Sequence, residues 1–472
     1  MSHSKTVGEM ENLNALFKLQ SDNRWSMSQT SASQRKDLLK KLKSSVESRR
    51  EEIKAALYAD FKKPYAESEL TEIHTVIDEI NFAVKKLSSW MKPQRVGTPI
   101  ALFGSKSYIH YEAKGVVLVL APWNYPFALL INPLVAAIAA GNCVIARPSE
   151  KTPATGLILK KIIDEVFPEN VARVVIGEID LAEKLMELPF DHIFFTGSTQ
   201  VGKKIMLAAA KNLIPVTLEL GGKSPVIIDR DVDLKDCAEK LFWGKFMNGG
   251  QTCVAPDYVY IPEELKEKFI ELFKEQIEKR FGETSLDRLK TEDFARIIDV
   301  KAFERLAHKI QDEKKLFSDQ PLKDERYIPP TLLTDVSLNR PIMEDEIFGP
   351  IMPLLTYKNV ETVIDYIQKN PKPLALYVFS KNKKMIKKVL RSTTSGGVAI
   401  NHVVLHLANP HLPFGGVGHS GLGSYHGVFG FKTFSHERAV LHQGRFTLSN
   451  LYFPPYSSSL SKLAFKLLRF LE

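Results

Sequence analysis

The sequence of 472 residues contains only three cysteines, an odd and small number that excludes a disulfide scaffold and suits a reducing compartment. It lacks an uninterrupted run of about 18 apolar residues, the length that a membrane-spanning helix needs. Its 26 glycines follow no fixed period, which excludes a collagen-like chain. The first residues show no basic stretch followed by an apolar one, so no signal peptide is expected. We therefore expect a cytoplasmic protein.

Charge of one sign does not dominate the chain either. Lys and Arg number 64 against 55 Asp and Glu, which gives a net charge of +9, and the two signs are interspersed. A basic balance can favour nucleic acids or anionic membranes, but without an arginine-rich arm we expect no nucleic-acid partner. Hydrophobic residues make up 44% of the chain, which is typical of a globular protein and excludes disorder as its main state. The length predicts two or three domains.

Short apolar runs alternate with helical periodicity between residues 115 and 222. The expected strands are 115–122, 142–150, 171–177, 191–198 and 216–222. The expected helices are 133–140, 152–166, 180–188 and 201–211. This alternation indicates an α/β fold with a parallel, doubly wound sheet, which binds ligands at the carboxyl ends of its strands. Amphipathic helices are expected before it, over 33–57 and 67–90, and a second α/β block after residue 223.

A glycine-bounded loop joins an expected strand to an expected helix. It consists of Gly197, Ser198, Thr199, Gln200, Val201 and Gly202. Free N–H groups at a helix N-terminus bind phosphate, and glycine lets the backbone come close to the anion. The loop is not the G-x-G-x-x-G pattern, and it nearly matches a P-loop except that Lys204 replaces the Ser or Thr that would hold magnesium. A phosphate site, a P-loop hydrolase and an ordinary tight turn all remain open.

One cysteine stands in a context that suits a nucleophile. Cys253 follows two glycines in the segment GGQTC, where a thiol on a tight loop is accessible to a substrate. Cys143 lies in an expected strand and Cys237 on an expected helix, so both are interpreted as small buried hydrophobic residues.

Three further motifs carry polar groups beside glycine, proline or aromatic residues. Glu219 ends an apolar strand, where burial would raise the pKa of its carboxyl and suit it to act as a base, unless it is simply solvated. Asn124 is the centre of PWNYP and could donate to a developing oxyanion, unless the segment is only a packed aromatic turn. Glu346 and Phe348 belong to a similar loop, EIFGP.

In their order and spacing these motifs resemble the NAD(P)-dependent aldehyde dehydrogenase superfamily. The motifs are PWNYP, the Pro-Ser-Glu strand end, FTGST-x-x-G, LELGGK, GGQTC, EIFGP and LPFGGVG, and the resemblance covers residues from about 10 to 445. The ending SGLGSYHG…FKTFSHERAV resembles the class 3 branch, which contains fatty and aromatic aldehyde dehydrogenases.

The resemblance implies a role for each motif. Cys253 matches the nucleophile, Glu219 the general base and Asn124 the oxyanion amide, helped by the backbone N–H of Cys253. The cofactor residues that it implies are Trp123, Ser198 and the loop from Gly197 to Gly202 at the phosphates, Glu150 at the adenosine ribose, Glu346 at the nicotinamide ribose and Phe348 beside the nicotinamide. No metal is implied.

The sequence departs from the family pattern at one cofactor position. Arg147 stands three residues before Glu150, where the family usually has Lys. A guanidinium favours phosphate, whereas Glu150 should repel the 2′-phosphate of NADP. We therefore expect NAD as the preferred cofactor, with NADP also used.

The resemblance implies an aldehyde dehydrogenase that oxidises medium- or long-chain aliphatic or aromatic aldehydes to carboxylic acids, as a homodimer. The expected domains are cofactor-binding (1–85 and 110–222), catalytic (223–397), bridging (86–109 and 398–423) and a C-terminal extension (424–472) with an amphipathic helix. In that helix Lys462, Lys466 and Arg469 form one stripe, and the leucines at 460, 463, 467, 468 and 471 lie mainly on the other. This pattern allows peripheral membrane contact or ordinary packing. An acylating relative that passes its thioester to coenzyme A, and a non-catalytic use of the fold, are the other classes left open.

Overall fold

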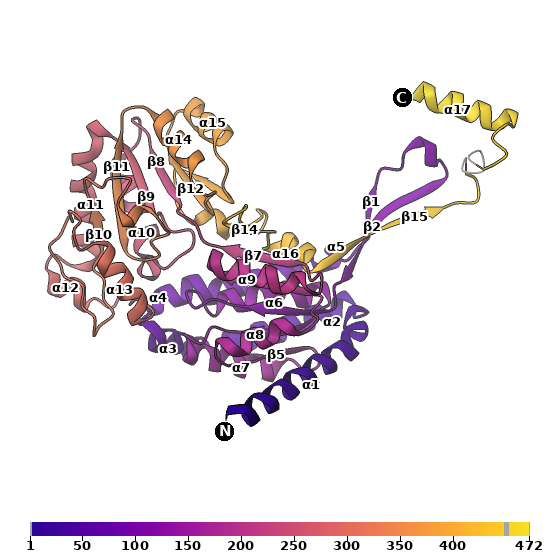
Figure 1. The fold of residues 1–472 in the computed structure, drawn as a ribbon, viewed down its shortest axis with the longest axis horizontal. Coiled ribbons are helices and arrows are strands. Elements are labelled where there is room, and N and C mark those ends of the chain that lie inside the picture. The colour runs from indigo at the N-terminus through magenta and orange to yellow at the C-terminus, as the bar shows by residue number, and fades with distance from the viewer. Residues whose placement is uncertain (1, 448–452, 472) are drawn as a thin grey trace.

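The computed structural model describes residues 2–447 and 453–471, with side chains from residue 12 onward except 464 and 467–471. Two α/β bodies lie side by side and a narrow arm extends away from them (Figure 1). The α/β class expected from the sequence is confirmed.

The first body contains a six-stranded sheet in the order β14-β7-β6-β3-β4-β5. All neighbours are parallel except β14, which runs antiparallel to β7. The strands are β3 (Val116–Leu120), β4 (Cys143–Arg147), β5 (Ala172–Val174), β6 (His192–Gly197), β7 (Val216–Leu220) and β14 (Gly421–Leu422). The connecting helices are α6 (Ala128–Ala140), α7 (Pro153–Val166), α8 (Ile179–Glu187) and α9 (Thr199–Ala210). Every residue of β3 and β4 is buried, as expected for a parallel sheet covered on both faces.

Helices from the N-terminal part of the chain pack against this body. They are α1 (Ser2–Ser28), α2 (Ala32–Ser48), α3 (Arg50–Phe61), α4 (Tyr65–Ser68), the π-helix η1 (Glu69–Ile73) and α5 (His74–Trp90). The helix expected over 33–57 is divided at Arg49 into α2 and α3. A capping box of Ser31 and Gln34 begins α2, because each side chain satisfies a backbone N–H that the first helical turn leaves free.

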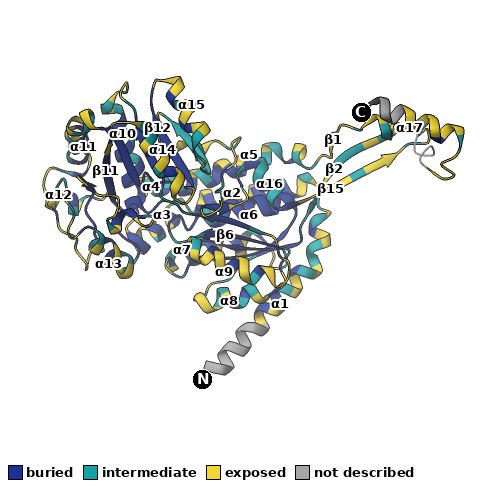
Figure 2. Ribbon diagram, turned by 45° about the horizontal axis from the view of Figure 1, so that its top comes forward, coloured by how far each residue is buried: buried dark blue, intermediate teal, exposed yellow. Residues whose placement is uncertain are grey.

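The second body contains a six-stranded parallel sheet in the order β10-β11-β9-β8-β12-β13. The strands are β8 (Pro225–Ile228), β9 (Tyr258–Pro262), β10 (Thr331–Leu333), β11 (Ile351–Tyr357), β12 (Ala375–Phe379) and β13 (Gly397–Ile400). The helices are α10 (Leu234–Phe246), α11 (Lys266–Phe281), α12 (Ser285–Lys290), α13 (Val300–Lys309), α14 (Val360–Lys369) and α15 (Lys383–Ser392). The central strands of both sheets are buried, whereas the outer helices are exposed on one side (Figure 2).

The arm is a three-stranded antiparallel sheet of β1 (Gln94–Val96), β2 (Ser105–Ala113) and β15 (Ser435–Gln443). The sequence led us to expect that 398–423 joins 86–109, but the long partner of β2 is β15, from the segment assigned to the C-terminal extension. Most residues of β15 are exposed, so the apolar alternation of a strand is missing from its sequence. Helix α16 (Gly427–Thr433) precedes β15, and α17 (Ser459–Leu471) lies near the tip of the arm (Figure 1). None of the described helices is both long and apolar enough to cross a membrane.

Candidate active site

A cavity of about 800 Å³ is lined by both α/β bodies and by α5. It brings together predicted residues that are far apart in the sequence, namely Trp123, Asn124, Gly197, Ser198, Glu219, Cys253, Glu346 and Phe348. The other predicted cofactor residues, Arg147, Glu150, Thr199, Gln200, Val201 and Gly202, do not line this cavity. Within the described part of the chain, no three or more His, Cys, Asp or Glu side chains are grouped so that they could hold a metal ion.

A strained loop places Cys253 in the cavity. Three successive residues after α10 have left-handed backbone conformations, with φ of 58° at Asn248, 61° at Gly249 and 73° at Gly250. A Cβ atom at Gly250 would lie 2.3 Å from the carbonyl oxygen of Gly349, so only glycine fits there. Cys253 is half-buried, whereas Cys143 and Cys237 are buried away from the cavity.

The surroundings of Cys253 favour the protonated form of its thiol. Burial, and then the carboxylates of Glu346 and Glu219, raise its pKa to about 12. Its own backbone N–H and that of Val254 lower the pKa by a smaller amount. Because the thiolate is the nucleophilic form, proton removal has to accompany attack on a substrate or follow a change in charge within the cavity.

Glu219 is a buried carboxyl group without a hydrogen-bond partner. It lies on β7, is 2% exposed, and neither of its carboxylate oxygens bonds to any described residue. Burial alone raises its pKa well above the ordinary value. A carboxyl group in this state holds a proton readily, as a general base requires.

Asn124 connects two loops of the site. Its side-chain Nδ2 donates to the backbone carbonyl oxygen of Gln251 at 3.0 Å. The backbone carbonyl oxygen of Asn124 accepts from Nδ2 of Asn248 at 2.9 Å. An amide nitrogen has two hydrogens, so a second N–H of Asn124 can serve an oxyanion in the cavity.

The predicted phosphate loop is the N-terminus of α9. Ser198 is its N-cap and accepts from the backbone N–H of Val201 at 3.4 Å. Thr199 donates to the carbonyl oxygen of His419 at 3.0 Å, which fixes the first turn. The N–H groups of this turn and the helix dipole suit a phosphate.

Arg147 and Glu150 form an ion pair beyond the carboxyl end of β4. Nη2 of Arg147 donates to Oε2 of Glu150 at 2.8 Å and to the carbonyl oxygen of Gly177 at 2.9 Å. The carboxylate therefore offsets the positive charge that could attract a 2′-phosphate.

Glu346, Phe348 and Trp123 lie together at the other end of the predicted cofactor site. The rings of Trp123 and Phe348 meet edge to face, with centroids 5.3 Å apart. Burial, and then the charge of Asp257, raise the pKa of Glu346 to about 8. A Cβ atom at Gly221 would lie 2.1 Å from Oε2 of Glu346, so the absence of a side chain at Gly221 leaves room for this carboxylate.

The sequence did not predict that several polar residues hold the catalytic loops in place. Oη of Tyr125 and Oγ1 of Thr252 lie 2.6 Å apart, and Glu67 accepts from the backbone N–H of Asn248 at 2.9 Å. Tyr125 and Thr252 could have been found as neighbours of Asn124 and Cys253. Glu67 gave no signal, because a charged residue in a helical stretch is normally solvated.

Known proteins share both the sequence pattern and the fold. The chain matches the Aldehyde dehydrogenase family over residues 8–440. It is 44% identical over 424 residues to the 4,4'-diaponeurosporen-aldehyde dehydrogenase of Staphylococcus aureus (strain NCTC 8325 / PS 47), covering 89% of this chain and 92% of that protein.

Two solved structures extend the similarity to three dimensions. The substrate-bound state of Staphylococcus aureus AldH matches with a TM-score of 0.92 at 41% identity, covering 97% of this chain and 99% of that one. The NAD+ complex of aldehyde dehydrogenase from Bacillus cereus matches with a TM-score of 0.83 at 27% identity, covering 92% and 89%. The chain is an oxidoreductase that belongs to the aldehyde dehydrogenase family.

Proposed function

We propose that this protein oxidises medium- or long-chain aliphatic or aromatic aldehydes to carboxylic acids with NAD(P)+, through a covalent intermediate on Cys253. The observation that carries the proposal is the cavity that Cys253, Asn124 and the unpartnered carboxyl of Glu219 line together. These groups supply a nucleophile, an oxyanion donor and a base.

The reaction begins when the thiol of Cys253 releases its proton to solvent and the sulfur adds to the aldehyde carbon. The oxygen of the aldehyde becomes an oxyanion, which Nδ2 of Asn124 and the backbone N–H of Cys253 stabilise. A bound nicotinamide would accept the hydride that leaves the tetrahedral carbon. Glu219 then takes a proton from a water molecule, and the oxygen of that water attacks the thioester. The C–S bond breaks, the acid leaves, and the sulfur of Cys253 takes the proton back from Glu219.

The residues present fit a dinucleotide. The N-terminus of α9 supplies N–H groups for phosphate, Glu150 and Glu346 supply carboxylates for ribose hydroxyls, and the side chains of Trp123 and Phe348 line the cavity. Because Glu150 offsets the charge of Arg147, NAD is the preferred cofactor and NADP the weaker one. A larger kcat/KM with NADP than with NAD would contradict this preference.

The lining of the cavity supports an apolar substrate. Beyond the catalytic residues it presents Leu129 from α6, Trp243 and Met247 from the end of α10, and Leu407. The test is formation of reduced nicotinamide with a chain-length series of aldehydes, with Cys253→Ser as the control. We expect kcat/KM to rise with chain length and the signal to vanish in the variant. Silence with every aldehyde and both cofactors would refute the function.

Acyl transfer to coenzyme A is the second candidate reaction. Glu219 argues against it, because a base that activates water is not needed when a thiol takes the acyl group. Product analysis with and without coenzyme A separates free acid from acyl-coenzyme A.

The arm supports assembly as a homodimer. It exposes apolar side chains in the segments between and after its strands, with Ile100 62%, Phe103 61% and Phe446 88% exposed. Light scattering of the intact protein tests the dimer.

The C-terminal helix supports peripheral contact with a membrane. Its exposed side chains include Leu460, Leu463, Lys462 and Lys466, while Arg469 and the leucines at 467, 468 and 471 lie outside the described side chains. Equal binding to anionic liposomes by the intact chain and by one truncated after Pro455 would refute membrane contact.

A further inference from the structure

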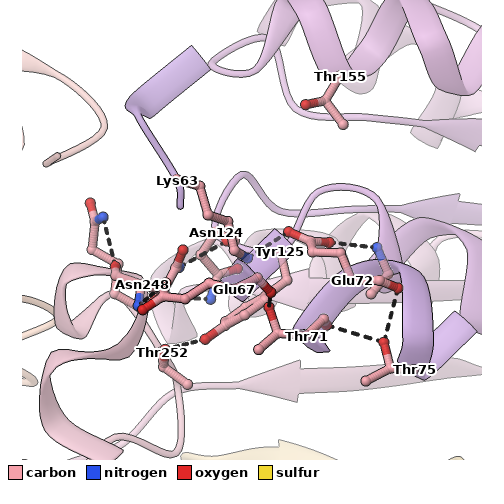
Figure 3. Close-up of polar contacts among 12 residues, drawn as sticks. Lys63, Glu67, Thr71, Glu72, Thr75, Asn124, Tyr125, Thr155, Asn248 and Thr252 are labelled. Atoms are coloured by element: carbon pink, nitrogen blue, oxygen red, sulfur yellow. Dashed lines mark hydrogen bonds and ion pairs between the residues drawn. The ribbon is translucent and has the colours of Figure 1, made fainter. Parts of the chain in front are cut away.

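A buried cluster of charged residues lies behind the nucleophile, and the reaction above does not use it. Lys63 and Glu72 are both fully buried, and Nζ of Lys63 donates to Oε1 of Glu72 at 2.8 Å (Figure 3). Burying an ion pair costs so much desolvation that an apolar pair of similar size is often equally stable. Stability alone therefore does not account for the pair.

The π-helix η1 helps to bring a second carboxyl group to this position. The backbone N–H of His74 donates to the carbonyl oxygen of Glu69, which closes a turn of i→i+5 type. Glu72 lies within this turn, and Glu67 precedes it in α4. We call Lys63, Glu67 and Glu72 the acid–lysine cluster.

The first two contacts of the cluster reach the turn that carries Asn124. Oε2 of Glu72 accepts from the backbone N–H of Ala128 at 2.8 Å, where that turn enters α6. The ammonium group of Lys63 lies 3.9 Å from the centroid of the Tyr125 ring, a cation–π contact. Oη of Tyr125 in turn lies 2.6 Å from Oγ1 of Thr252, the residue before Cys253.

The third contact reaches the nucleophile loop from its other end. Oε2 of Glu67 accepts from the backbone N–H of Asn248, which has the left-handed φ of 58°. Nδ2 of Asn248 donates to the carbonyl oxygens of Asn124 and Gln251, at 2.9 and 3.2 Å. Glu67 thus holds the residue that joins the two loops (Figure 3).

We propose that the acid–lysine cluster is a positioning device, which sets the Asn124 turn against the Cys253 loop through Tyr125 and Asn248. The proposal rests on the function proposed above. An oxyanion donor has to lie at hydrogen-bond distance from the oxygen formed during attack, and a displacement of about 1 Å can cost about a hundredfold in rate. Lys63, Glu67 and Glu72 do not reach the substrate, so they act through the loops that they hold.

The sharpest test is Tyr125→Phe, which removes only the hydroxyl that contacts Thr252. Tyr357→Phe is the matched control, because Oη of Tyr357 donates to the carbonyl oxygen of Ile228 at 2.7 Å and Tyr357 is buried outside the cavity. We expect kcat of Tyr125→Phe to fall about tenfold or more while KM for the aldehyde changes less than about threefold. Alkylation of Cys253 by iodoacetamide in the free protein should slow as well, and the control should match the wild type in both assays. Equal kcat and equal alkylation rates in Tyr125→Phe and the wild type would overturn the proposal.

A double variant tests the charges themselves. Lys63→Met with Glu72→Gln replaces the ion pair by neutral groups of similar size and keeps an acceptor for the N–H of Ala128. We expect thermal unfolding within a few degrees of the wild type, but kcat and the alkylation rate lowered as in Tyr125→Phe. A loss of kcat that merely follows a loss of folded protein would overturn the proposal.

The two proposals fail in different ways. If the wild type oxidises no aldehyde, the proposed function fails, whereas the iodoacetamide rates still decide whether the cluster positions Cys253. If the wild type is active and all variants match it, only the positioning device is refuted.

Discussion

Replacement of Glu219 by Gln tests both the proposed role of Glu219 as a base and the effect of its buried carboxyl on the free energy of unfolding. Neither carboxylate oxygen of Glu219 bonds to a described residue, so a glutamine of the same shape breaks no contact that orients the loop. The kinetic loss therefore reports the missing base. A positioned general base contributes about 10²- to 10⁴-fold, or about 3–5 kcal/mol of the barrier to thioester hydrolysis.

Rapid mixing with NAD and an aldehyde is the assay that separates the two halves of the reaction. We expect Glu219→Gln to form a burst of reduced nicotinamide equivalent to about one per site, followed by a steady-state rate lowered by about 10²-fold or more. The acyl-enzyme should then be trapped and found on Cys253 by mass spectrometry. A steady-state rate within threefold of the wild type would refute the role of Glu219 as the base.

The same substitution should stabilise the protein at neutral and alkaline pH. Burial raises the pKa of Glu219 above its ordinary value in the folded state, so folding favours the protonated acid. Below the ordinary pKa the carboxyl is neutral in both the folded and the unfolded state, so it does not reduce the free energy of unfolding. As the pH rises through the raised pKa, the folded protein has to bury a charge and loses stability. Glu219→Gln removes that loss, and chemical denaturation should show a gain over the wild type that grows from pH 5 to pH 9. A gain that is the same at every pH would contradict the linkage.

Three further predictions follow from other parts of the site. Glu346→Gln should be as stable as the wild type at pH 4.5 and more stable above pH 8, because the pKa of Glu346 is raised from 4.5 to about 8. At about 1.4 kcal/mol per pH unit, the gain in unfolding free energy is up to about 5 kcal/mol. Denaturation at both pH values measures it. Gly250→Ala should lose about 2 kcal/mol or more of unfolding free energy and most activity, because its φ is 73° and the new Cβ would meet the carbonyl of Gly349; a variant with wild-type stability would contradict the geometry. Arg147→Gln leaves Glu150 without its cation, so kcat/KM should fall about tenfold more with NADP than with NAD, and equal losses with both would contradict the charge argument.

The sequence predicted the doubly wound sheet because its strands are continuous apolar runs, and burial on both faces requires that pattern. Residues 116–120 and 143–147 are buried throughout and were expected as strands. The strand Ser435–Gln443 could not be found in this way, because pairing with β2 in an exposed arm does not demand apolar residues. Helix boundaries such as the break at Arg49 depend on local backbone geometry that periodicity does not show.

The site was predicted from short sequence motifs. Each motif is a few neighbouring residues, whereas the cavity is lined by segments far apart in the sequence. Glu219 lies near the end of an expected strand, and Asn124 and Cys253 lie in loops that the sequence places, so their meeting at one cavity could be expected. Lys63, Glu67 and Glu72 could not, because they have the spacing of an ordinary charged helix. Only the structure shows that Lys63 and Glu72 are buried and that Glu67, which is half-buried, contacts the backbone of Asn248.

Acids whose pKa is raised by desolvation are concentrated in and beside this site, to a degree that folding alone would not favour. Burial raises the pKa of Glu67 to about 7, that of Glu346 to about 8 and that of Glu219 well above its ordinary value. Each of these shifts lowers the stability of the folded protein at neutral pH. The fully buried strands of the two sheets contribute the apolar burial that offsets this cost. The raised pKa values of the Cys253 thiol and of Glu219 therefore have the same main cause, which is burial, and any change that opens these two groups to solvent should lower both pKa values together and weaken the base.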